Sequence, residues 1–281
     1  MKYYSLNQSL STLEKFARAN NLQNLEIIKW IVVKTLRLTI SQFENIKQIS
    51  QDKLSLMKDY IIRYKEGESL SKIFGYIEFY GGFFNVTENV FDPRLSSETL
   101  IDETLKIDNQ YLKNAKIIDI CTGSGCIAIT LSRILNKTID ALDISPFALD
   151  IAKINSKKNK TKINLIKFDI NNNWQPLFSK KYDIIISNPP YWNADKILNN
   201  EEVIRNNPEI GFYGGEDGLK YIKIIIENAY KYLNSKGHLL LEVDFDQIKF
   251  VKDYMKKYGF YNIKVAKDHK NIDRVVSCQK H

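Results

Sequence analysis

The chain contains one five-residue stretch whose residue types could bind a planar amino group. Residues 187–191 read Ser-Asn-Pro-Pro-Tyr and follow the apolar run 182–186, so they lie where a buried strand is expected to end. Two successive prolines fix two φ angles and remove two N–H donors, which leaves the carbonyl groups of Asn188 and Pro189 without ladder partners. With the Asn188 side chain, these acceptors suit an NH2 group that donates two hydrogens. The competing interpretation is a plain proline turn.

A glycine-rich turn upstream is a second chemical signal. The apolar run 116–120 precedes the turn 121–125, which reads Cys-Thr-Gly-Ser-Gly, and a helix is expected from Cys126. Such a turn lets the backbone approach a ligand, and the acid that ends the next strand, Asp143, can accept both hydroxyls of a ribose. The third glycine of the dinucleotide pattern is missing after Gly125. This disfavours NAD and favours S-adenosyl-L-methionine, which has no pyrophosphate.

One further acid follows the third strand. Asp169 is placed to meet an adenine amino group, although a loop carboxylate or a helix cap explains it equally well. The residues assigned to the cofactor are Asp119, Cys121, Thr122, Gly123, Ser124, Gly125, Asp143, Asp169, Ile170 and Asn188.

The elements that position these groups alternate between strand and helix after residue 115. This alternation predicts an α/β fold with a doubly wound, parallel sheet. The expected strands cover residues 116–120, 139–143, 164–168, 182–187, 238–243, 262–265 and 273–277. Before it, apolar residues recur at helical spacing from residue 5 to 72, with Trp30 expected in their core. Aromatic residues around Gly81 and Gly82 predict a β-hairpin.

These patterns divide the chain into three parts. We expect an N-terminal helical domain at residues 1–74, a hairpin linker at 75–93 and a catalytic domain at 94–281. Arg94 and Glu98, four residues apart, are expected either to brace the loop over the cofactor or to pair with each other.

Composition narrows the class of protein. The 281 residues are 44% apolar, as in a globular chain, and carry a net charge of +8, which permits an anionic partner such as RNA. The three cysteines and three histidines are scattered, so we expect no metal site and a reducing compartment. No apolar run is long enough to span a membrane, and the stretch after Met1 lacks the apolar core of a signal peptide. We therefore expect a cytoplasmic protein.

Taken in order, these features resemble the amino-methyltransferases that act on exocyclic NH2 groups. Further motifs occur at residues 67–70 (GESL), 73–75 (IFG), 78–81 (EFYG), 93–98 (PRLSSE), 119–128 (DICTGSGCIA), 187–191 (SNPPY) and 214–219 (GGEDGL). As a set they resemble the HemK/PrmC family, the protein-(glutamine-N5) methyltransferases of class I peptide release factors. The resemblance covers about residues 60–245, and the helical domain agrees only in character.

The resemblance implies a Rossmann-like class I methyltransferase sheet, an N-terminal substrate-docking domain and S-adenosyl-L-methionine as cofactor. The implied substrate is the glutamine of the Gly-Gly-Gln motif in class I peptide chain release factors. Catalysis would involve Asn188, Pro189 and Tyr191, and the substrate pocket would add Pro190. Tyr191 would form a wall of the pocket, although plain core packing is the alternative. We expect a monomer that binds no membrane, no metal and no nucleic acid directly.

Five positions depart from the pattern of that family. Cys121 replaces a common glycine, Asp92 an isoleucine, Leu95 a proline, Trp192 an aliphatic residue and Asp244 a glycine. Of these, we expect Asp244 to be the one that can alter the cofactor pocket. A catalytically weakened member of the family is therefore an alternative.

Three alternative functions stay open. One is an amino-methyltransferase of RNA or DNA bases, and a second is a glutamine methyltransferase of a ribosomal protein. The third is a non-catalytic binding module for release factors or ribosomes. Retention of both halves of the site disfavours a pure binder.

Overall fold

The computed structural model describes residues 2–175 and 181–281, so Met1 and residues 176–180 within the expected catalytic domain lie outside the described part. Contacts between residues divide the chain into two compact units, Met1–Gly75 and Tyr76–His281. No helix of the described residues is both long and apolar enough to cross a membrane.

The first unit is mainly helical, as the spacing of its apolar residues predicts. Its elements are β1 (Tyr3–Ser5), α1 (Leu6–Ala19), α2 (Glu26–Leu36), a 3-10 helix (Ile40–Asn45), β2 (Gln48–Ser50), α3 (Gln51–Lys65) and α4 (Leu70–Phe74). The short antiparallel pair of β1 and β2 was not expected. Leu13, Ile31 and Met57 meet in the core of the unit. The expectation for Trp30 was wrong: its side chain is 45% exposed, because α2 turns Ile27 and Ile31 inward and Trp30 away from them.

The second unit begins with the expected hairpin of β3 (Tyr76–Phe79) and β4 (Gly82–Asn85). Its two-residue turn falls at Tyr80 and Gly81, whose φ angles are 45° and 68°. Positive φ at both central residues matches the right-handed twist of the flanking strands. The turn therefore lies one residue before the Gly-Gly pair.

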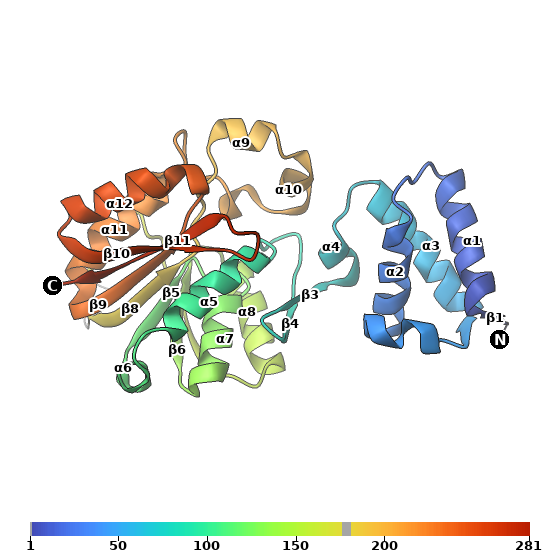
Figure 1. The fold of residues 1–281 in the computed structure, drawn as a ribbon, viewed down its shortest axis with the longest axis horizontal. Coiled ribbons are helices and arrows are strands. Elements are labelled where there is room, and N and C mark those ends of the chain that lie inside the picture. The colour runs from blue at the N-terminus through green and yellow to red at the C-terminus, as the bar shows by residue number, and fades with distance from the viewer. Residues whose placement is uncertain (1, 176–180) are drawn as a thin grey trace. The chain divides into compact units, whose positions relative to one another are not determined.

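A seven-stranded sheet forms the centre of this unit (Figure 1). In sequence order its strands are β5 (Ile117–Ile120), β6 (Ile139–Asp143), β7 (Ile163–Lys167), β8 (Tyr182–Ser187), β9 (Leu233–Glu242), β10 (Phe260–Lys267) and β11 (Asp273–Lys280). Their spatial order is β10-β11-β9-β8-β5-β6-β7. Strand β11 pairs antiparallel with both β10 and β9. The predicted doubly wound α/β sheet is confirmed. The last three strands are longer than expected, and the antiparallel strand was not foreseen.

Helices cover both faces of this sheet. They are α5 (Glu98–Leu105), α6 (Asn109–Asn114), α7 (Cys126–Leu135), α8 (Pro146–Lys158), α11 (Lys220–Tyr232) and α12 (Ile248–Lys257). Successive strand residues point to opposite faces. Accordingly, Ile117 belongs to the buried cluster that contains Leu131 of α7, whereas Ile118 belongs to the cluster that contains Ile222 of α11. In Figure 1, α5, α7 and α8 lie on one side of the sheet and α11 and α12 on the other.

Candidate active site

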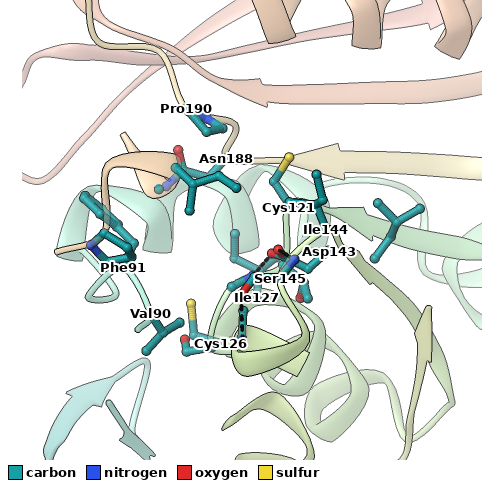
Figure 2. A pocket seen from close by; sticks show the side chains of 18 of the residues that line it. Val90, Phe91, Cys121, Cys126, Ile127, Asp143, Ile144, Ser145, Asn188 and Pro190 are labelled. Carbon is teal, nitrogen blue, oxygen red and sulfur yellow. Dashed lines mark hydrogen bonds between the residues drawn. The ribbon is translucent and has the colours of Figure 1, made fainter. Parts of the chain in front are cut away.

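The carboxyl ends of β5, β6 and β8 meet at one edge of the sheet, where parallel strands of open α/β folds form ligand sites. The chain order changes here, because β5 lies between β6 and β8. A cavity opens at this point. Its lining residues from the sequence assignment are Cys121, Thr122, Gly123, Ser124, Asp143, Asp169, Ile170, Asn188 and Pro190. Both halves of the expected site therefore share one cavity. Figure 2 shows Asn188 and Pro190 at one end of it, and Val90 and Cys126 at the other.

The glycine turn connects β5 to α7 and has a specific steric requirement. Gly125 has φ of 80°, and a Cβ atom added there would lie 2.9 Å from Ile129 Cδ1 and 3.0 Å from the Ala152 side chain. Glycine is thus needed for close packing of α7 against α8, and Gly125 is not among the cavity-lining residues. Cys121 has φ of 60°. That left-handed conformation favours glycine, which explains the family preference from which this residue departs.

Asp143 ends β6 and faces the cavity. Its Oδ2 accepts a hydrogen bond from Gly123 N at 2.8 Å, and its Oδ1 accepts one from Ser145 N at 2.9 Å. Burial raises the pKa of this carboxyl, and those backbone hydrogen bonds oppose the rise. The carboxylate consequently holds the glycine turn in place while it remains next to the ligand space.

Asp119 does not line the cavity, although the sequence assigns it to the cofactor. It is fully buried, and its Oδ2 accepts hydrogen bonds from Thr122 Oγ1 at 2.6 Å and Ala128 N at 3.3 Å. Burial raises the pKa of Asp119 to about 7. Asp119 therefore stabilises the glycine turn and the start of α7 through these hydrogen bonds and does not face the ligand space.

This raised pKa predicts a pH-dependent stability. Unfolded aspartate titrates near pH 3.9, so between about pH 4 and 7 the folded chain holds a proton that the unfolded chain releases. The free energy of unfolding should therefore fall as pH rises through this window and level off above it, by at most about 4 kcal/mol. Urea unfolding of the cofactor-free protein and of Asp119→Asn measures the effect. The Asn variant should gain stability relative to the wild type as pH rises, and a pH-independent difference would contradict the prediction.

Asp169 follows β7 and also lines the cavity. Its Oδ1 accepts hydrogen bonds from Asn171 N at 2.9 Å and Asn171 Nδ2 at 2.6 Å. Asp169 therefore also stabilises its own loop, which was the alternative interpretation of this residue. The carbonyl group of Ile170 accepts a hydrogen bond from the buried indole of Trp174 at 2.9 Å. These contacts fix the loop after β7, which lines the cavity.

The loop after β8 contains the amide-binding candidates. Asn188 Nδ2 donates to Ser97 Oγ at 3.0 Å, while no hydrogen bond from the described residues reaches Asn188 Oδ1. Pro189 is buried and Tyr191 half-buried, and neither lines the cavity. The carbonyl of Tyr191 accepts from Gln247 Nε2 at 2.8 Å.

The glycine-rich motif at 214–219 packs against this loop. A Cβ on Gly218 would lie 2.4 Å from the Tyr191 carbonyl oxygen, and a Cβ on Gly214 would lie 2.7 Å from the carbonyl oxygen of Pro190. These glycines allow the backbone to support the loop at close range.

Sequence reasoning missed one wall of the cavity. Residues 89–93, the end of the expected linker, line it together with Arg94 and Ser97, and of these only Arg94 was expected near the cofactor. Asn155 of α8 is buried and connects the end of β4, which precedes this wall, to the glycine turn. Its side chain forms hydrogen bonds with both backbone groups of Asn85, at 2.7 and 3.0 Å, and donates to Ser124 O at 2.9 Å. No local pattern marks such a contact, because it joins segments 70 residues apart.

Arg94 and Glu98 have separate partners. The guanidinium group of Arg94 lies 4.8 Å from the centre of the Phe91 ring, at the cavity wall. Glu98 Oε1 accepts from Tyr80 N of the hairpin turn at 2.6 Å. These contacts disfavour an ion pair between the two side chains, and they leave the bracing of the cavity wall to Arg94 while Glu98 holds the hairpin turn.

Asp244 does not line the pocket that it was expected to alter. It lies outside the cavity lining, forms an ion pair with Lys196 and lies 3.6 Å from Arg274 Nη1. Trp192 pairs through its backbone with Phe212 and also lies outside the lining. Of the five departures, only Cys121 and Asp92 line the cavity.

The charges around the cavity indicate the kind of ligand that it can hold. Its lining includes three carboxylates, Asp92, Asp143 and Asp169, and among the described lining residues Arg94 alone is basic. Leu142, Ile144 and Phe168 add apolar surface. An acidic, partly apolar cavity suits a nucleoside with a cationic group and does not suit a pyrophosphate. The described residues contain no group of three or more side chains that could hold a metal ion.

Comparison with known proteins adds the following likenesses. Residues 95–216 match the model of the family described as "Methyltransferase small domain". The chain is 33% identical over 262 residues to the release factor glutamine methyltransferase of Thermodesulfovibrio yellowstonii, covering 92% of this chain and 93% of the relative. It is 32% identical over 281 residues to that of Buchnera aphidicola subsp. Baizongia pistaciae, covering 100% and 98%. A T. thermophilus 16S rRNA N2 G1207 methyltransferase shares the fold, with a TM-score of 0.53 and 14% identity, over 73% of this chain and 50% of that protein.

Proposed function

Because the chain belongs to the family of release factor glutamine methyltransferases, we propose that it methylates the side-chain amide nitrogen of the Gly-Gly-Gln glutamine in class I peptide chain release factors. The observation that carries this proposal is the acceptor Asn188 Oδ1, which no hydrogen bond from the described residues reaches, at one end of an acidic cavity suited to a cationic nucleoside.

S-adenosyl-L-methionine supplies an electrophilic methyl group on a sulfonium when it is bound. Asp143 would accept the ribose hydroxyls, and Asp169 and Ile170 would meet the adenine. The residues 121–124 would line the rest of the cofactor. The predominance of carboxylates in the lining supports a ligand with positive charge.

The loop after β8 would bind the substrate amide. Asn188 Oδ1 and the carbonyl of Pro189 each accept one amide hydrogen, which holds the NH2 group and directs its lone pair at the methyl group. As the N–C bond forms and the C–S bond breaks, the nitrogen becomes positive and its hydrogens more acidic, so both hydrogen bonds strengthen in the transition state. The surplus proton then leaves to solvent, and no titrating base is needed. Pro190 and Tyr191 would shape this pocket.

The remaining parts of the proposal concern partners and location. We propose that the chain acts as a monomer. The N-terminal unit would dock the release factor. We further propose that the reaction takes place in the cytoplasm, where a release factor would be available, and that it needs no direct nucleic-acid contact.

The decisive experiment is transfer of labelled methyl from S-adenosyl-L-methionine to a purified class I release factor. A copy whose Gly-Gly-Gln glutamine is replaced by alanine serves as the control. We expect label on the first protein only. Equal labelling of both would exclude this glutamine, and labelling of RNA instead would favour a base amino-methyltransferase.

A further inference from the structure

Gln247 is a buried residue whose side-chain amide has partners at both of its ends. It belongs to the 3-10 helix Phe245–Gln247, which follows β9. Its Oε1 accepts a hydrogen bond from Asp244 N at 3.0 Å. Its Nε2 donates to Tyr191 O at 2.8 Å and to Gly218 O at 3.3 Å. A primary amide accepts at its oxygen and donates two hydrogens at its nitrogen, so these contacts define which way the amide points.

The loop after β8 has few groups of its own through which it can be held. The prolines at 189–190 have no N–H, so this stretch must be anchored by its carbonyl oxygens and by the residues that flank it. Before the prolines, Ser187 Oγ donates to Ile120 O at 2.6 Å. After them, Gln247 donates to the carbonyl of Tyr191. The two acceptors proposed for the substrate amide lie between these anchors.

The backbone around the second anchor is closely packed. A Cβ atom on Gly218 would lie 2.4 Å from Tyr191 O and 2.7 Å from Gln247 Nε2. No side chain at position 218 could therefore enter this space and replace the amide as a donor. A carbonyl that loses its donor in such surroundings costs about 1–3 kcal/mol, which the loop can avoid only by moving.

We propose that Gln247 is a positioning residue that fixes the Asn-Pro-Pro-Tyr loop by donating to the Tyr191 carbonyl. Because each proline fixes one φ angle, residues 187–191 have few free torsions, and an anchor at their end determines where the acceptors of Asn188 and Pro189 lie. Gln247 itself does not line the cavity. This inference rests on the proposed function, since those acceptors are the groups assigned to the substrate amide.

The first test replaces the amide with a titratable group of the same shape. In Gln247→Glu, an ionised carboxylate would place an oxygen against two carbonyl oxygens, whereas the protonated carboxyl can donate one hydrogen to Tyr191 O. Burial raises the pKa of a carboxyl. We expect kcat for release factor methylation to be about 10- to 100-fold below wild type at about pH 8, with most of the deficit recovered at about pH 6. Each value is taken relative to wild type at the same pH.

The charges near position 247 do not reverse this direction. Asp244 forms an ion pair with Lys196, and its Oδ1 lies 3.6 Å from Arg274 Nη1, so its charge is compensated. Asp246 is exposed to solvent. Burial raises the pKa of the Tyr191 hydroxyl, and that group stays neutral. Desolvation is therefore the main influence on a carboxyl introduced at position 247.

The second test removes the donor without introducing a titratable group. Gln247→Leu should lose a similar factor in kcat at both pH values, because no protonation restores the hydrogen bond. The KM for the release factor and the Kd for S-adenosyl-L-methionine, measured by calorimetry, should stay near wild type in both variants. Bound cofactor also shows that each variant is folded. A pH-independent deficit in Gln247→Glu, or a matching loss of cofactor affinity, would overturn the inference.

Gln279→Glu is the matched control. Gln279 lies on β11, is partly buried and has its Nε2 3.1 Å from His238 Nε2, outside the lining of the cavity. Its replacement should leave kcat unchanged at both pH values. An equal, pH-dependent loss in this variant would mean that any buried carboxyl has the effect and would contradict a specific role of Gln247.

The outcomes separate this inference from the function beneath it. If the wild-type protein labels no release factor, the proposed function fails and the inference falls with it. If the wild type is active and Gln247→Glu keeps its full kcat at about pH 8, only the inference fails.

Discussion

Replacing Asn188 with alanine should reduce kcat for release factor methylation by about 10²- to 10³-fold. The variant lacks the side-chain acceptor that holds one amide hydrogen, and loss of one preorganised polar contact to a transition state costs about this much. Affinity for S-adenosyl-L-methionine should change little, because the carboxylates that face the cavity remain. Single-turnover methyl transfer and calorimetry measure the two quantities.

Asn228→Ala is the matched control for this variant. The Asn228 amide is bonded to Ile224 O within α11, away from the cavity lining, so its loss should not affect turnover. Comparable losses of turnover and cofactor affinity in Asn188→Ala would argue against the role proposed for Asn188.

The second large effect is expected at Asp143. Asp143→Ala should weaken S-adenosyl-L-methionine binding by about 100-fold, since a hydrogen bond to a charged group contributes about 1.5–3 kcal/mol and a ribose offers two hydroxyls. The variant also loses the acceptor for Gly123 N, which holds the glycine turn. Equilibrium binding measures the effect, and saturating cofactor should restore most of kcat.

The matched control is Asp140→Ala on the same strand. Asp140 accepts from Tyr182 OH at 2.6 Å and Asn164 Nδ2 at 3.1 Å and does not line the cavity. An equal loss of cofactor affinity in both variants would point to general damage to β6 and against a specific role of Asp143.

The strands and the residues at their ends could be predicted because their signals are local. Apolar runs mark β5, β6 and β8 directly in the sequence, and a glycine turn, Asp143 and the Asn188-Pro189-Pro190 stretch mark their respective carboxyl ends. The cavity wall at residues 89–93 could not be predicted, because tertiary packing brings that segment to the cavity. The contact between Ser97 and Asn188 could not be predicted either, because these residues are 91 positions apart in the sequence. Trp30 is a different case: the apolar spacing of Ile27 and Ile31 marks the buried face of α2, and Trp30 lies off that face.

The support of the glycine turn by Asn155 also bears on how this catalytic unit could be shortened or fused to other proteins. The family match begins at residue 95. Asn85, which is hydrogen-bonded to Asn155, and the cavity wall at residues 89–94 both precede that residue. A fragment cut at residue 95 would leave the Asn155 amide without its Asn85 partners and the ligand space open on one side. The smallest portable methyltransferase module should therefore begin at the hairpin, near Tyr76.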